Sequence, residues 1–263
     1  MPETDTALLA DAARQSGDIA LQFFRRNPEV IDKPDGAGPV TEADLAVNAM
    51  LQDRLVTARP DYGWLSEETE DTTARMSTHR QFVVDPIDGT RAFIQGGKDW
   101  CHAIAVVENG QVVSAAVYLP VRDVLFTATL GGGAAMNGAP IRASAAPITG
   151  ASVLAAKPNF DGSFWRGGMA PPVKQAFRSS LAYRLCLVGQ GKFDGMLTLR
   201  PSWEWDIAAG ALIASEAGAR VTDQHNRSLQ FNNLHPQVPG VLAAGPGLHA
   251  NLADLLEPPT ANP

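Results

Sequence analysis

The stretch that decides the fold reads Asp85-Pro86-Ile87-Asp88-Gly89-Thr90 and directly follows the apolar run Phe82-Val83-Val84. The apolar run predicts a buried strand, and Pro86 and Gly89 predict a tight turn at its end. Such a turn can bring both carboxylates to one point, where they repel each other unless a cation lies between them. The N–H groups of Gly89 and Thr90 can then receive an anion beside that cation. This pattern is typical of metal-assisted phosphate chemistry, and a Pro-Gly turn with two solvated acids is the simpler alternative.

Three further acidic segments argue against the simple turn. Pro39-Val40-Thr41-Glu42-Ala43-Asp44 and Trp64-Leu65-Ser66-Glu67-Glu68 precede it, and Glu204-Trp205-Asp206-Ile207-Ala208-Ala209 follows it. In this order and spacing, the four segments resemble the inositol monophosphatase superfamily of Mg²⁺-dependent phosphatases. The resemblance extends from about Lys33 to about Gly218, with Ser66 in place of a usual glycine.

The resemblance implies a layered α-β-α-β-α sandwich of the inositol monophosphatase and fructose-1,6-bisphosphatase type. The residues themselves indicate an α+β first half with an antiparallel sheet and a second half in which α and β alternate. We expect an N-terminal α+β domain over residues 1–145, which carries most metal ligands. A C-terminal α/β domain over residues 146–263 would carry Asp206 and the substrate-side residues. Thr41 is the expected N-cap of a helix, and Asn109-Gly110 predicts a β-hairpin.

The resemblance also implies a set of ligands for two or three Mg²⁺ ions. Asp85 would bridge two ions, with Glu67 and the Ile87 carbonyl completing the first site. Asp88 and Asp206 would hold the second ion, and a third, weaker ion near Glu67 would orient the attacking water. Ions in such a site neutralise the phosphate, make a water nucleophilic and stabilise the leaving alkoxide.

The family resemblance assigns water activation to Thr90 and Asp44, which would act beside Glu67. The Thr90 hydroxyl would accept a hydrogen bond from the water and donate its own proton to Asp44, so that no histidine base is required. Gly89, Thr90 and Asp88 would also contact the substrate. Asp44 and Asp206 both stand at the start of helix-like runs, so helix capping is an alternative for each.

The substrate prediction depends on the residues before Asp206. Inositol monophosphatases proper place a glutamate six or seven residues before this aspartate, where Leu199 and Arg200 stand here. The segment from Pro201 to Asp206 instead resembles the 3′(2′),5′-bisphosphate nucleotidase (CysQ-type) branch. Arg200 would then meet a second phosphate and Trp203 would face a base. The favoured substrate is adenosine 3′,5′-bisphosphate, cleaved to AMP and phosphate. The alternatives are inositol 1-phosphate, another polyol phosphate or histidinol phosphate, and a regulatory relative without catalysis.

Other polar and aromatic residues have simpler interpretations. Glu68 and Glu70 are expected to be solvated charges, and Glu204 is expected to be exposed beside its neighbour Trp205. Lys33 lies where the superfamily has a mobile basic loop over the site. Trp100, Trp203 and Trp205 are interpreted as apolar anchors in preference to substrate platforms. The five histidines show no paired metal-binding spacing.

Composition limits the classes of partner. The chain has 263 residues and a formal charge of −7, which argues against a nucleic-acid polymer as partner and leaves a small phosphorylated metabolite. The two cysteines lack metal-motif spacing. Residues 1–15 carry charges that a signal peptide would lack, and no segment approaches the roughly 18 apolar residues of a membrane helix. We expect a cytoplasmic protein with no membrane partner, either a monomer or a homodimer.

Overall fold

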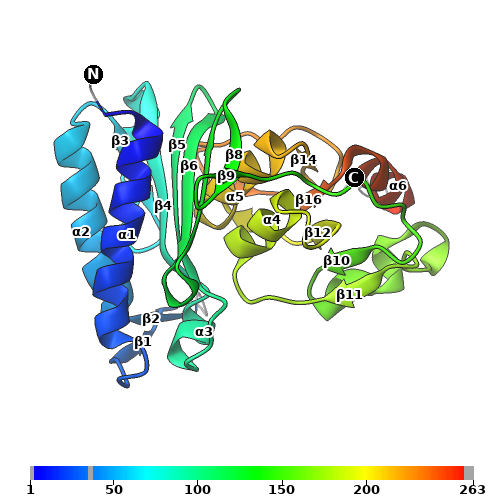
Figure 1. The fold of residues 1–263 in the computed structure, drawn as a ribbon, viewed down its shortest axis with the longest axis horizontal. Helices are drawn as coiled ribbons and strands as arrows, with labels where there is room; N and C mark the ends of the chain where they lie inside the picture. The colour runs from blue at the N-terminus through cyan, green and yellow to red at the C-terminus, as the bar shows by residue number, and fades with distance from the viewer. Residues whose placement is uncertain (1–2, 35–37, 258–263) are drawn as a thin grey trace.

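The computed structural model describes residues 3–34 and 38–257, which form five layers. Helices α1 and α2 cover one face of a seven-stranded sheet, and helices α4 and α5 cover its other face (Figure 1). A five-stranded sheet follows, and α6 packs against it. The predicted α-β-α-β-α sandwich is therefore confirmed.

The outer helices of the first half are α1 (Asp5–Phe23) and α2 (Glu42–Ala58). Thr41 is the N-cap of α2, as predicted, because its hydroxyl accepts hydrogen bonds from the N–H groups of Ala43 and Asp44. The Asp44 carboxylate returns the contact by accepting from the Thr41 N–H, which completes a capping box. The cap fixes where α2 begins and buries Asp44 at its first turn.

The large sheet has the strand order β3-β4-β5-β6-β7-β8-β9. Its strands are β3 (Gly63–Ser66), β4 (Arg80–Asp88), β5 (Cys101–Glu108), β6 (Gln111–Leu119), β7 (Val124–Thr129), β8 (Gly133–Met136) and β9 (Ala139–Pro140). The predicted hairpin is confirmed, since Asn109 and Gly110 join β5 to β6 with φ values of 51° and 78°.

One strand pair departs from the predicted antiparallel sheet. Strands β3 and β4 run parallel, with Ser66 opposite Val84. Their carboxyl ends therefore lie at the same edge of the sheet, and the next residues along the two strands are Glu67 and Asp85. The Glu67 N–H donates to the Val84 carbonyl at 3.2 Å, which continues the register into the turn.

The second sheet has the strand order β11-β10-β12-β16-β14. Its strands are β10 (Ser152–Leu154), β11 (Lys174–Ala176), β12 (Gly195–Thr198), β14 (Arg220–Thr222) and β16 (Val241–Ala244). Between the two sheets lie α4 (Leu181–Gly189) and α5 (Glu204–Glu216), while α6 (Pro246–Leu255) packs on β16. The division into domains at residues 145 and 146 stays a prediction, because α5 contacts strands of both sheets.

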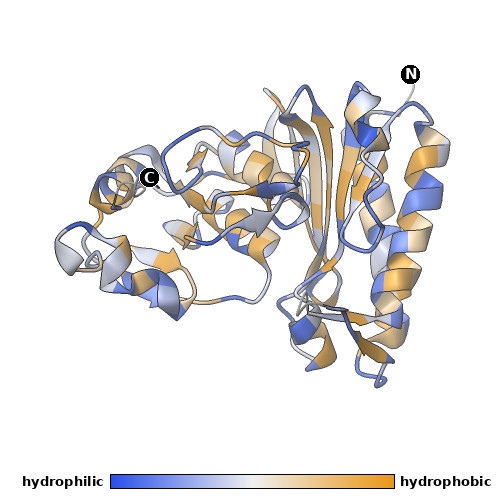
Figure 2. Cartoon of the chain, turned by 180° about the vertical axis from the view of Figure 1, so that it is seen from behind, coloured by the Kyte–Doolittle hydropathy of each residue, from blue (hydrophilic) through white to orange (hydrophobic). Residues whose placement is uncertain are grey.

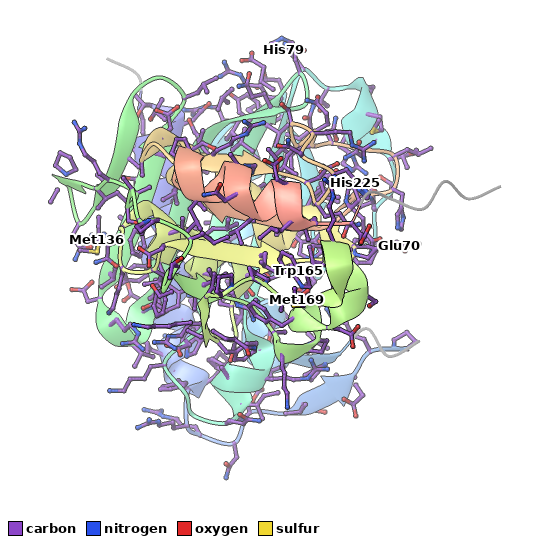
Figure 3. The ribbon with its side chains drawn as sticks, turned by 90° about the vertical axis from the view of Figure 1, so that its right-hand side faces the viewer. Glu70, His79, Met136, Trp165, Met169 and His225 are labelled. Atoms are coloured by element: carbon purple, nitrogen blue, oxygen red, sulfur yellow. The ribbon has the colours of Figure 1, made fainter. Side chains whose placement is uncertain are left out.

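Smaller elements complete the described chain. They are β1 (Val30–Asp32), β2 (Pro39–Thr41), α3 (Thr90–Ile94), β13 (Ser202–Trp203) and β15 (Gln237–Val238). The segment between residues 157 and 168 contains short 3₁₀ helices, such as Gly162–Phe164. Trp165 is buried there, which anchors the segment, whereas Met169 is 75% exposed (Figure 3).

Apolar residues follow the strands and the inner faces of the helices (Figure 2). The largest buried cluster joins one face of the large sheet to α4 and α5, so the site between them rests on a packed core. Within residues 3–34 and 38–257, no helix combines the length and the apolar character that crossing a membrane requires.

Candidate active site

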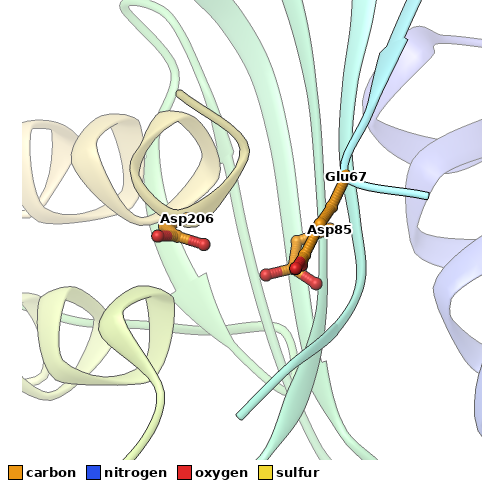
Figure 4. A group of neighbouring side chains, drawn as sticks. All are labelled: Glu67, Asp85 and Asp206. Carbon is orange, nitrogen blue, oxygen red and sulfur yellow. The ribbon is translucent and has the colours of Figure 1, made fainter. Parts of the chain in front are cut away.

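Three of the predicted metal ligands form a compact acid cluster. Carboxylate oxygens of Glu67, Asp85 and Asp206 lie within 4.8 Å of one another. Glu67 and Asp85 follow from the parallel strands β3 and β4, and Asp206 projects towards them from the first turn of α5 (Figure 4). The cluster therefore joins the two halves of the chain.

The electrostatics of this cluster favour a bound cation. Burial raises the pKa of Asp85 well above its usual range, and the charges of Glu67 and Asp88 raise it further. Burial and the charges of Asp88 and Glu67 likewise raise the pKa of Asp206. Among the described residues, no group donates a hydrogen bond to the buried Oδ1 of Asp85. A buried acceptor without a partner is costly, and Mg²⁺ prefers such oxygen ligands, so the cluster fits a hard divalent cation.

Asp88 lies outside this group of three and faces the N-terminus of α4. Its Oδ2 accepts hydrogen bonds from the Ser180 hydroxyl at 2.6 Å and from the Ala182 N–H at 2.7 Å. Burial raises its pKa to about 6, and these hydrogen bonds oppose the rise. Its role as a metal ligand stays a prediction. Ser180, which holds Asp88, was missed, although a serine before the apolar run of α4 is a typical helix N-cap.

Thr90 and Asp44 come together as the sequence predicted. The Thr90 hydroxyl lies 3.4 Å from Asp44 Oδ1 and 3.1 Å from the Ile87 carbonyl oxygen. The first distance is longer than the roughly 2.7–2.8 Å typical of O–H···O bonds. Asp44 Oδ2 accepts from the N–H and hydroxyl groups of Thr41, so helix capping and contact with Thr90 use different oxygens. Burial raises the pKa of Asp44 to about 6.

Gly89 makes the turn between the two aspartates and Thr90 possible. Its φ is 102°, a left-handed conformation that side chains disfavour. A Cβ atom at this position would lie 3.0 Å from the Asp99 carbonyl oxygen. The turn therefore requires glycine for its conformation and for its close approach to the neighbouring chain.

A cavity of about 390 Å³ holds most of the predicted site. Its walls include eight of the predicted site residues, namely Glu67, Asp85, Ile87, Asp88, Gly89, Thr90, Arg200 and Asp206, but not Asp44. Phe177 also lines it and was missed by the sequence reasoning. Trp203 is not among the described residues of the wall, and its ring stacks on Trp205 at 4.7 Å between centroids. The expectation that Trp203 faces a base gains no support from this geometry and stays a prediction.

Lys33 and Glu68 form an ion-pair group at the rim of the cluster. The Lys33 ammonium donates to Glu67 at 2.9 Å and to Glu68 at 2.7 Å. The side chain of Glu68 is only 5% exposed, so the expectation of a solvated charge is wrong. Burial and the Glu67 charge raise the pKa of Glu68 to about 7, against the opposing effect of Lys33. Residues 35–37 of the predicted basic loop lie outside the described residues.

Glu204 is fully buried, which corrects the expectation that it is exposed. Its carboxylate accepts hydrogen bonds from the Asn232 N–H at 2.7 Å and from the Asn233 N–H at 2.9 Å. Arg75 donates to the same pair of asparagines. This network fixes the first turn of α5, from which Asp206 projects.

Glu70 and His79 both lie outside the cluster, and the expectation for Glu70 is confirmed. Glu70 is exposed, as predicted for a solvated charge (Figure 3). His79 lies at the molecular surface with a side chain that is 70% exposed (Figure 3). Neither residue lines the cavity described above.

Comparison with known proteins agrees with this fold and this acid cluster. The model of the inositol monophosphatase family matches residues 1–259, and the chain belongs to this family of phosphatases. Enzymes of the family use Mg²⁺ and act on small phosphorylated substrates.

Individual relatives carry different activities in their names. The chain is 31% identical to the inositol monophosphatase of Dictyostelium discoideum, over 96% of this chain and 95% of that protein. It is also 31% identical to the 3′-phosphoadenosine 5′-phosphate phosphatase of Mycobacterium leprae, over 90% and 87% of the two chains. Among solved structures, the extragenic suppressor protein SuhB from Bartonella henselae matches with a TM-score of 0.80 and 27% identity, over 94% and 96%.

Proposed function

We propose that this chain is a Mg²⁺-dependent phosphomonoesterase that hydrolyses adenosine 3′,5′-bisphosphate to AMP and phosphate. The observation that carries the proposal is the cavity whose lining includes both the acid cluster, with Asp85 buried, and the cation Arg200. The acid cluster supports the chemistry, and Arg200 supports the choice of a substrate with a second phosphate.

The metal ligands in this proposal are Glu67, Asp85, the Ile87 carbonyl, Asp88 and Asp206. The unpaired Oδ1 of Asp85 and the raised pKa values of the cluster support this assignment. When bound, Mg²⁺ supplies charge neutralisation for the phosphate and lowers the pKa of water.

In this proposal, Thr90 and Asp44 orient the attacking water. The Thr90 hydroxyl accepts a hydrogen bond from the attacking water and donates its own hydrogen to Asp44 Oδ1, which lies 3.4 Å away. Asp44 is held in place by the α2 capping box, so its free oxygen keeps one direction. The N–H groups of Gly89 and Thr90 donate to phosphate oxygens at the wall of the cavity.

The choice of substrate depends on the residues at the cavity that come from the second half of the chain. Leu199 is buried and apolar, and Arg200 is an exposed cation that lines the cavity. No carboxylate stands at either position to bind the hydroxyl groups of a sugar alcohol, whereas a guanidinium binds a phosphate well. The name of the Mycobacterium leprae relative agrees with this choice. Inositol 1-phosphate is the second candidate, because the Dictyostelium relative is equally similar and is named an inositol monophosphatase.

A substrate panel tests the proposal. We expect kcat/KM to be highest for adenosine 3′,5′-bisphosphate when it is compared with inositol 1-phosphate and histidinol phosphate at saturating Mg²⁺. A preference for either polyol or histidinol substrate would overturn the substrate choice and leave the phosphatase chemistry intact. Absence of phosphate release from all three would favour a relative without catalysis.

A further inference from the structure

We propose that Phe177 is a stacking platform for a planar aromatic ring in the substrate's leaving group, and that Arg184 holds one face of the Phe177 ring. The inference rests on the proposed function, because it assigns the nucleobase of the substrate to one wall of the same cavity. It concerns a residue outside all the motifs that resemble the superfamily.

Phe177 has the position that such a platform needs. It directly follows β11, at the edge of the five-stranded sheet, and it lines the cavity that contains the acid cluster. Its side chain is 53% exposed, although an aromatic ring of this size is normally well covered. Phe177 is also the one aromatic side chain among the described residues that line this cavity.

Arg184 distinguishes Phe177 from an ordinary exposed apolar residue. The Arg184 guanidinium carbon lies over the ring, 4.5 Å from its centroid, in a cation–π contact. Arg184 itself is buried in α4, and its Nε donates to the Arg178 carbonyl at 2.6 Å. Arg184 thus covers one face of the ring, and its charge is influenced by Asp88, Asp206 and Arg200, which all line the cavity. The ring is thus supported on one face while its exposed surface lies at the cavity wall.

No carboxylate among the described residues forms an ion pair with Arg184 within 4.0 Å, although Asp88 and Asp206 lie near enough to influence its charge. Burial lowers its pKa to about 10, so it is charged at neutral pH. A buried charge of this kind is costly, and the contact with the Phe177 ring and the Arg178 carbonyl partly offsets that cost. Arg184 therefore fixes the loop that carries Phe177.

The residues that line the cavity favour a ligand that carries phosphate groups at one end and a planar apolar ring at the other. The acid cluster and the Gly89 turn lie on one side of the cavity for a phosphate, and Arg200 supplies a cation for a second anion. The Phe177 ring offers a flat apolar surface, on which nucleobases stack well and sugar alcohols do not. Phe177 is favoured over Trp203, because Trp203 is not among the described residues that line this cavity and its ring stacks on Trp205.

The test compares two substrates across a set of variants. The kcat/KM for adenosine 3′,5′-bisphosphate is divided by the kcat/KM for glycerol 2-phosphate, which has no base. We expect Phe177→Ala to lower this ratio by about 5- to 150-fold, mainly through a higher KM for the nucleotide. Phe177→Tyr, which keeps the ring, should retain the ratio within about threefold. The matched control is Phe164→Ala, which removes another exposed phenyl ring that does not line the cavity.

Three outcomes separate the two proposals. A wild-type ratio near unity would overturn the nucleotide as substrate and the platform with it. A high wild-type ratio that Phe177→Ala leaves unchanged would overturn the platform alone. An equal fall in the ratio for Phe164→Ala would also overturn it, because the effect would then not depend on the cavity wall.

Discussion

The two walls of the cavity differ in what they contribute. The wall at the carboxyl ends of β3 and β4 presents acids and a turn, all from segments close to Glu67 and Asp85. The lining that comes from loops of the second half of the chain, which we call the opposite wall, presents Arg200 and Phe177. Asp206 is the exception, an acid that reaches across from α5. Under the proposed function, one wall carries the chemistry and the other selects the substrate.

The largest expected effect on activity concerns Asp85, on the wall that carries the acids. Asp85→Asn should lower kcat by about 10⁴-fold or more for every substrate, because this residue is the proposed bridge between two ions. Steady-state kinetics with Mg²⁺ measure the loss, and Asp161→Asn, at an exposed position, is the control. A loss for one substrate class only would contradict the division between the two walls.

The next effect concerns the water-activating pair. Thr90→Ala and Asp44→Asn should each lower kcat by about 10²- to 10⁴-fold, since Thr90→Ala removes the contact to the attacking water and Asp44→Asn removes the carboxylate that accepts the Thr90 hydrogen. The double variant should be scarcely worse than either single variant, because residues that act as a unit are not additive.

Calorimetric titration with Mg²⁺ and thermal unfolding complete the test of this pair. Metal affinity should change little, and the thermal midpoint shows whether Asp44→Asn weakens the α2 cap. Losses that multiply in the double variant would refute the pairing. A large fall in Mg²⁺ affinity for Asp44→Asn would place this residue among the ligands instead.

A smaller, substrate-dependent effect is expected on the opposite wall. Arg200→Ala should lower kcat/KM for adenosine 3′,5′-bisphosphate by about 10- to 150-fold relative to inositol 1-phosphate, because a charge-assisted contact to the second phosphate is lost. Arg220→Ala, at an exposed arginine of β14, is the matched control. An equal loss for both substrates would indicate that Arg200 acts in the hydrolysis itself and not in the selection of the substrate.

The smallest effect concerns stability. His102 is buried behind the turn, where its Nδ1 contacts the Pro86 carbonyl, and burial lowers its pKa from 6.5 to about 4. The unfolded state therefore binds more protons between these values, so His102 contributes stability above pH 6.5 that is lost as the pH falls to about 4.

Urea unfolding of the wild type and of His102→Asn measures this contribution. The amide of Asn can still donate to the Pro86 carbonyl, but it does not titrate. The stability advantage of the wild type over the variant should shrink by about 3 kcal/mol between pH 7.5 and pH 4. Parallel pH profiles for the two proteins would show that His102 does not titrate as described.

The sequence predicted best those features that depend on residues close together in the chain. The segment from Asp85 to Thr90 combines proline, glycine and two acids within six residues and lines the cavity as expected, but β4 continues to Asp88 with a bulge between Asp85 and Asp88, so the tight turn predicted directly after Val84 occurs only at Gly89. The hairpin at Asn109-Gly110 and the Thr41 cap are equally local signals. The parallel pairing of β3 with β4 was not predicted, because register depends on contacts between distant segments.

The opposite wall was harder to predict for the same physical reason. Glu204 has no local signal for burial, since the asparagines that satisfy it lie nearly thirty residues away. Phe177 stands in a stretch without a motif, and only the fold brings it to the cavity. Trp203 was expected to face a base, but stacking on Trp205 turned out to dominate its surroundings.

The central claim is that the buried acid cluster works through Mg²⁺. The most direct measurement is phosphate release from adenosine 3′,5′-bisphosphate by protein dialysed exhaustively against EDTA, before and after Mg²⁺ is restored. We expect activity to disappear on chelation and to return with Mg²⁺, because Glu67, Asp85 and Asp206 lie within 4.8 Å and need a cation between them. Full activity in excess EDTA would contradict the account.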